Sequence, residues 1–294
     1  MKSVMTFGLA LLCAGAPASL FAQTGTVVFS NIPTPIPGNV PSQGYQCCGT
    51  AELGDLIRLE AETPRRAGFA TVLMSSWAMR SDYPTMPAAG YTHPITLAIY
   101  ANAADALSHT PLRTVTQTFT IPWRPEPDPT CGGTAWRYDA SSCFNGFAFT
   151  ITFDLKALNL TLPDEFIYGV AFNTNSWGYA PLGVGGPYES LNVGLANVGN
   201  VGVPPSVGVD VDPDVVFWNT VHATWYSDGG AGGGGTFRAD GGWIGYAPAA
   251  KFTTFAIPTT TAECKNGAWE NLVRADFTPF KNQGACVSYV NTGR

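Results

Sequence analysis

Charged residues are scarce in this chain of 294 residues, because Asp, Glu, Lys and Arg together make up only 12% of it. Glycine and proline are abundant instead, with 33 and 23 copies. This composition suits many short strands joined by tight turns better than it suits long helices. We therefore expect an all-β protein with little helix.

Histidine is also rare, and the familiar catalytic motifs are missing. Three histidines occur, His93, His109 and His222, and none has the H-x-H or H-E-x-x-H spacing of a zinc site. The G-x-S-x-G nucleophile elbow is absent. The sequence therefore gives no recognisable catalytic set.

A pair of carboxylates for glycoside cleavage stays open, because the sequence cannot place acids relative to one another. The acidic residues considered for that role are Asp154, Asp164, Glu165, Glu189, Asp228 and Asp240.

Long apolar runs are missing beyond the first residues. Met1-Lys2 precedes an apolar run from Val4 to about Leu12, and small residues follow as far as Ala22. This pattern predicts a secretory signal over residues 1–22, with an apolar run too short to span a bilayer. Since no later run approaches spanning length, we expect a secreted, extracellular protein without a membrane span.

Basic residues are fewer than acidic ones. Without Lys2 the chain has 14 basic and 21 acidic residues, a net charge of −7. Such an acidic surface argues against nucleic acid or an anionic membrane as partner.

The cysteines indicate disulfides. Cys13 would leave with the signal, and an even number in an oxidising compartment reads as a disulfide framework. We expect Cys131–Cys143 and Cys264–Cys286 to pair, because each pair brackets a short segment that can close on itself. Adjacent Cys47 and Cys48 are left as a vicinal disulfide or two free thiols, and the sequence does not decide between them.

The most regular stretch is Gly146–Thr174. Phe147, Phe149, Ile151 and Phe153 alternate with smaller or polar residues, and residues 166–172 repeat that period of two. We expect these two strands at the centre of one antiparallel sheet, with Trp77 closing the core at the end of a further strand, Gly68–Met79. The expected fold is a single antiparallel β-sandwich of jelly-roll type over residues 24–257.

One acidic segment suits a cation. Asp210, Asp212 and Asp214 alternate in a loop, and such an oxygen-only set could hold calcium. Pro213 interrupts the EF-hand pattern, so a solvated turn whose Asp side chains cap backbone groups is the alternative. Apart from calcium, no cofactor is expected.

Aromatic residues gather in the predicted loops, where a ring either covers the core or stacks on a ligand. Sugars present C–H faces that such rings can cover. The candidate ligand-binding residues are Trp136, Trp177, Tyr179, Tyr188, Trp225 and Trp243.

The C-terminal segment, residues 264–294, follows a linker at 258–263. It reads C-K-N-G-A-W from Cys264 and F-K-N-Q-G-A-C-V from Phe280. It resembles short C-terminal segments of the form C-x-x-G-x-W…F-K-N-Q-G-x-C-V on many exported bacterial proteins, a resemblance that implies no activity. The larger part, including NIPTPIPGNVPS, TVLMSSWA and DVDPDVVFWNT, resembles uncharacterised secreted bacterial proteins.

Three functions from different classes remain. The first is a secreted binding module for a polysaccharide or cell-surface glycan, because the sandwich pattern and loop aromatics occur without a catalytic set. A polysaccharide-active hydrolase or lyase is the second, and a structural exported protein is the third.

Overall fold

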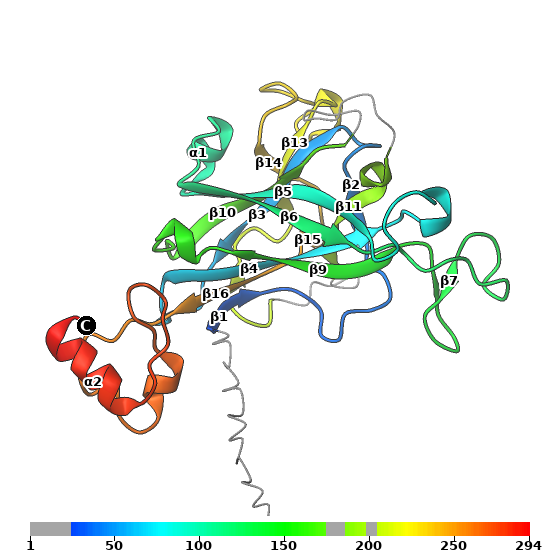
Figure 1. The fold of residues 1–294 in the computed structure, drawn as a ribbon. Helices are drawn as coiled ribbons and strands as arrows, with labels where there is room; N and C mark the ends of the chain where they lie inside the picture. Colours follow the sequence, from blue (N-terminus) through cyan, green and yellow to red (C-terminus); the bar gives the residue numbers. More distant parts are fainter. Residues whose placement is uncertain (1–24, 175–185, 198–204) are drawn as a thin grey trace, which may run out of the picture.

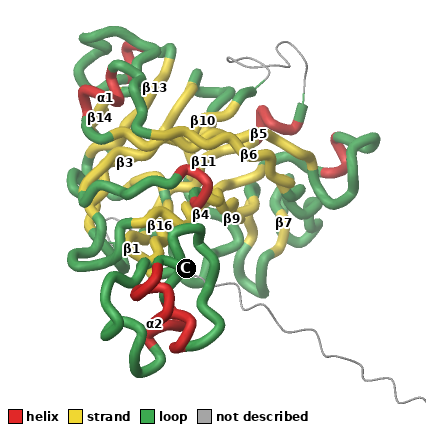
Figure 2. Tube along the Cα trace, turned by 60° about the vertical axis from the view of Figure 1, so that its left-hand side comes forward, coloured by secondary structure: helices red, strands yellow, loops and turns green. Residues whose placement is uncertain are grey.

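Two stacked β-sheets form the body of the protein (Figures 1 and 2). The structure is a computed structural model, and it describes residues 25–174, 186–197 and 205–294. The first sheet contains β1 (Thr26–Ser30), β2 (Ser42–Gly44), β4 (Arg66–Ser76), β9 (Phe147–Asp154), β11 (Leu191–Asn197), β15 (Tyr246–Pro248) and β16 (Ala250–Phe255). The second contains β3 (Thr50–Arg58), β5 (Tyr91–Tyr100), β6 (Arg113–Ile121), β10 (Glu165–Phe172), β12 (Val209–Asp210), β13 (Val215–Thr220) and β14 (Arg238–Gly241).

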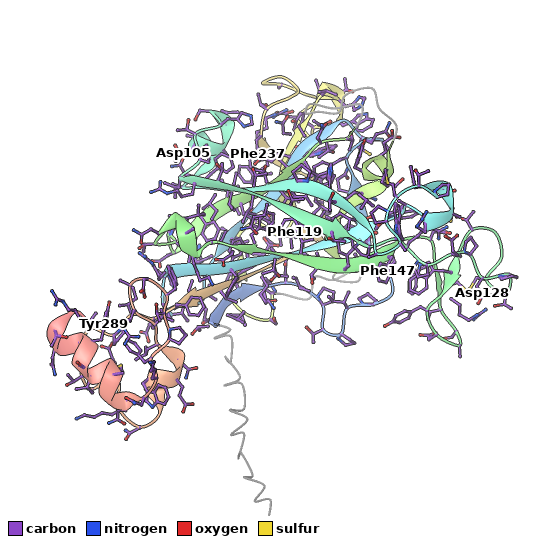
Figure 3. All side chains as sticks on the ribbon, in the orientation of Figure 1. Asp105, Phe119, Asp128, Phe147, Phe237 and Tyr289 are labelled. Atoms are coloured by element: carbon purple, nitrogen blue, oxygen red, sulfur yellow. A yellow bond between two sulfur atoms is a disulfide. The ribbon has the colours of Figure 1, made fainter. Side chains whose placement is uncertain are left out.

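Aromatic side chains from both sheets fill the space between them. Phe166 and Tyr168 of β10 pack on Phe252 of β16, with ring centroids 5.2 and 5.5 Å apart. Phe119 of β6 packs edge to face on Phe153 of β9 at 4.9 Å, between the two layers in Figure 3. The named strands pair antiparallel throughout, from β1 with β16 to β5 with β6. The predicted antiparallel β-sandwich is therefore confirmed.

The prediction that the two most regular strands share one sheet is wrong. β9 pairs with β4 in the first sheet, whereas β10 lies between β3 and β5 in the second. Alternation shows which side chains share a face of a strand, but it does not show which sheet the strand joins.

The expectation that Trp77 closes the core is also wrong, since 41% of this side chain is exposed. β4 ends at Ser76, so the alternation that places inward residues no longer applies at residue 77.

A small lobe extends from one end of the sandwich, next to Phe147 in Figure 3. It contains β7 (Trp136–Arg137), paired with β8 (Cys143–Phe144), and the predicted Cys131–Cys143 disulfide, whose Cα atoms are 5.7 Å apart. Rich in proline and glycine, this segment makes its own small sheet and adds no strand to the sandwich.

The C-terminal segment forms a second lobe around the predicted Cys264–Cys286 disulfide (Figure 1). Asn282 caps the start of α2 (Gln283–Thr292), because its side chain accepts a hydrogen bond from the Ala285 N–H. Phe277 leaves this lobe and packs edge to face on Phe255 of β16 at 5.8 Å, and the Arg66 guanidinium lies 5.0 Å from the Phe277 ring centre.

Helices contribute little elsewhere. The short 3₁₀ helices are η1 (Arg80–Asp82), η2 (Lys156–Leu158), η3 (Pro187–Ser190), η4 (Ala223–Trp225) and η5 (Ala268–Asn271). The α-helices of the described residues are α1 (Ala103–Leu107) and α2, of 5 and 10 residues, and neither is long enough to cross a membrane.

Candidate functional site

Three aspartates from different elements converge where β12 pairs with β3 in the second sheet. Asp55 lies on β3 between Leu53 and Ile57, both buried core residues, so its side chain faces the sandwich interior. Asp210 and Asp212 come from β12 and the turn after it. One carboxylate oxygen from each of the three aspartates lies within 4.8 Å of the others. We call these residues the aspartate cluster.

Backbone pairing brings the cluster together. Asp210 is the register partner of Ile57 on β3, and the Val211 N–H donates to the Leu56 carbonyl at 3.2 Å. After the turn, β13 continues in the same direction along β3, with Phe217 as the register partner of Gly54. The turn between β12 and β13 is therefore laid over Asp55.

The cluster is short of hydrogen bonds. Asp55 is fully buried, and although its Oδ1 accepts from the Leu56 N–H at 3.0 Å, its Oδ2 has no partner. Asp212 Oδ1 is buried and unpartnered as well. An unpaired charged group in such a place is unfavourable unless it is neutralised or binds a cation.

Burial and mutual repulsion set the electrostatics of the cluster. Burial raises the pKa of Asp55 well above its usual range, and the charges of Asp210 and Asp212 raise it further. Burial also raises the pKa of Asp210 to about 6 and that of Asp212 to about 7, the latter helped by the charge of Asp210.

The sequence identified two of the three members. Asp214 is not one of the three that converge; its backbone carbonyl instead accepts from the Trp243 N–H at 3.1 Å. Asp55 was missed, although an acidic residue at an inward position of the run Leu53-Gly54-Asp55-Leu56-Ile57 is a signal that could have found it.

A second arrangement is aromatic. Trp218 of β13 packs with Trp225 at 6.3 Å and with Trp243 at 5.6 Å between ring centroids. His222 stacks on Trp225 at 4.0 Å, with ring planes 18° apart. We call Trp218, His222, Trp225 and Trp243 the tryptophan surface, although Trp218 itself is buried and His222 and Trp243 are half-buried. It unites two residues that the sequence singled out, Trp225 and Trp243, and Trp225 is 48% exposed.

The remaining predicted aromatic residues lie elsewhere. Trp136 is buried in the disulfide lobe, where its Nε1–H donates to the Gly146 carbonyl at 2.7 Å, so it serves local packing. Tyr188 is half-buried and stacks on His93 at 5.2 Å. Trp177 and Tyr179 lie outside the described residues.

A buried glutamate lies on the outer face of the second sheet. Glu52 of β3 is buried, and the Tyr100 hydroxyl donates to its Oε1 at 3.0 Å. His109 Nδ1 lies 3.9 Å from Oε2. Burial raises the pKa of Glu52 to about 7, against the lowering effect of the Tyr100 hydrogen bond.

Two cysteines of the described residues lie outside the disulfides and adjoin the tryptophan surface. Cys47 and Cys48 are free, with Sγ atoms 2.7 Å apart. The Thr220 hydroxyl donates to the Cys48 carbonyl at 2.9 Å, which links this turn to the end of β13.

Comparison with known proteins does not assign this chain to a family. The comparisons with family models, with curated proteins and with solved structures found no match to this chain.

Proposed function

We propose that this chain is an extracellular binding protein whose tryptophan surface holds a polysaccharide or cell-surface glycan. The observation that carries the proposal is the Trp225 ring, which is 48% exposed although it stacks on His222 at 4.0 Å. Exposed beside other aromatic rings, the flat apolar face of Trp225 offers a surface on which a ligand can stack. Sugar rings offer C–H faces of matching shape.

The surroundings hold the tryptophan surface in place before a ligand arrives. Tyr226, next to Trp225, is buried, and its hydroxyl accepts from the Thr220 N–H at 3.0 Å and lies 3.1 Å from the Trp218 carbonyl. The Arg238 guanidinium covers the Tyr226 ring at 3.8 Å. A surface fixed in this way loses little conformational entropy on binding.

Retention on insoluble polysaccharides and binding to a glycan array test the proposal. An aromatic anchor contributes about 2 kcal/mol or more, so Trp225→Ala should weaken binding by about 30-fold. Trp77→Ala is the matched control, because this exposed tryptophan is not part of the tryptophan surface. Equal loss in both variants, or no retention of the unmodified protein on any glycan, would reject the proposal and favour a structural role.

Glu52 supports the second candidate, a polysaccharide-active hydrolase or lyase. A carboxyl group with a pKa of about 7 suits a general acid. Both Glu52 and Tyr100 are buried, however, so a polymer has little access to them. Release of reducing sugar that disappears in Glu52→Gln would favour the enzyme over the binding protein.

A further inference from the structure

We propose that the aspartate cluster, Asp55, Asp210 and Asp212, binds one calcium ion. The inference is independent of the proposed glycan binding, because it concerns other residues. Three carboxylate oxygens within 4.8 Å of one another can share a single ion. Calcium binds oxygens at 2.3–2.6 Å, so two ligands on opposite sides of it lie up to about 5 Å apart.

The buried Asp55 carboxylate on β3, which is separate from the acidic turn, also indicates a ligand. Asp55 is fully buried on the inner face of β3, and its Oδ2 has no hydrogen-bond partner. Buried carboxylates that stay charged are paired or coordinate a metal in folded proteins. The unsatisfied Oδ2 belongs to the oxygen-lined group that Asp210 and Asp212 complete.

No lysine or arginine of the described residues forms an ion pair with the aspartate cluster. Arg58 lies on β3 only three positions from Asp55, which places it on the opposite face of the sheet. There it pairs with Glu165 at 2.9 Å, and its side chain is 52% exposed. No ion pair of the described residues involves any of the three aspartates. No basic side chain of the described residues therefore neutralises the aspartate cluster.

The donor set selects the class of ion. Carboxylates alone suit calcium or magnesium, whereas zinc and copper prefer histidine or cysteine ligands. Magnesium demands octahedral geometry at 2.0–2.1 Å and retains most of its water, while calcium accepts irregular sets of 6–8 oxygens. Asp210 and Asp212 are half-buried, so the site opens towards solvent on one side, where water can complete the coordination.

The ion has a structural consequence. The turn after β12 is tied to β3 by the Val211–Leu56 hydrogen bond, and it reaches the tryptophan surface through the hydrogen bond from the Trp243 N–H to the Asp214 carbonyl. Calcium held by both Asp55 and Asp212 would join this turn to the sheet interior. It stabilises the folded state because the cluster is assembled only by folding.

Thermal unfolding tests the inference. The full chain is first stripped of metal with EDTA, and its melting temperature is then measured with added CaCl₂ or MgCl₂. Calorimetric titration with CaCl₂ gives the stoichiometry. At calcium a hundredfold above its dissociation constant, the melting temperature should rise by about 5 °C or more, with one site per chain. Asp55→Asn and Asp212→Asn should weaken calcium binding by at least tenfold.

Asp214→Asn is the matched control, because this acid lies in the same turn but outside the cluster. It should keep the calcium response. If Asp55→Asn does not fold, Asp212→Asn decides, since Asp212 lies in the turn and is only half-buried. No response of the unmodified protein to calcium, or an undiminished response in Asp212→Asn, would overturn the inference. An equal response to magnesium at the same concentration would overturn the assignment to calcium.

Discussion

Replacing Glu52 by glutamine should remove a pH-dependent loss of stability. The Glu52 carboxyl lies over Gly169 of the neighbouring strand so closely that a Cβ there would meet its Oε1 at 2.0 Å. It is 6% exposed, and burial raises its pKa from 4.5 to about 7. A shift of this size corresponds to about 3 kcal/mol of difference between the folded and unfolded states. A glutamine side chain at this position would fill the same space without the charge.

The sign follows from where the proton is bound. Below about pH 4.5 the carboxyl is protonated in both states, and the folded protein keeps its full stability. Between about pH 4.5 and 7 the unfolded chain releases the proton while folded Glu52 retains it, so stability falls as the pH rises. Above about pH 7 both states are ionised, and the loss is complete. Glu52→Gln should therefore match the unmodified protein near pH 4.5 and exceed it by about 3 kcal/mol at pH 8.

Urea unfolding at pH 4.5, 6 and 8 measures this difference, and taking the difference cancels the titration of the aspartate cluster. Glu62→Gln is the control, because this glutamate is exposed. The groups facing Glu52 are Tyr100, His109 and, on β13, its register partner Asn219. Repeating the series with His109→Gln separates any contribution of that imidazole. A difference between Glu52→Gln and the unmodified protein that does not change with pH would refute the reasoning.

Three further outcomes are expected. Trp136→Phe should lower the free energy of unfolding in urea by about 1 kcal/mol, because its hydrogen bond to the Gly146 carbonyl is lost. It should leave glycan retention unchanged, and weaker retention would contradict a packing role for Trp136. Non-reducing peptide mapping should link Cys131 to Cys143. Replacing both by serine should speed limited proteolysis between them, and an unchanged cleavage rate would show that the disulfide does not restrain this segment. Phe277→Ala should lower the melting temperature by a few degrees, because its ring packs on Phe255. An unchanged value would show that this ring contact does not stabilise the sandwich.

Local features of the sequence determined much of the fold. Period-two alternation identified β9 and β10 as strands, because a strand's side chains alternate whatever it pairs with. The two disulfides follow from short separations along the chain, 12 and 22 residues, which close loops with little entropy to lose. Composition also excluded a mainly helical protein, because each glycine or proline disfavours helix at its own position, whatever the rest of the fold.

The tertiary structure alone decided which segments meet. Alternation is identical for strands of either sheet, so it could not separate β9 from β10. Trp218, Trp225 and Trp243 come together because β13 and the loops after it fold back on one another. Asp55 and Asp212 are 157 positions apart, and only the pairing of β12 with β3 places their carboxylates within 4.8 Å. Contacts between distant segments depend on sheet pairing, a non-local choice that no single stretch of sequence encodes.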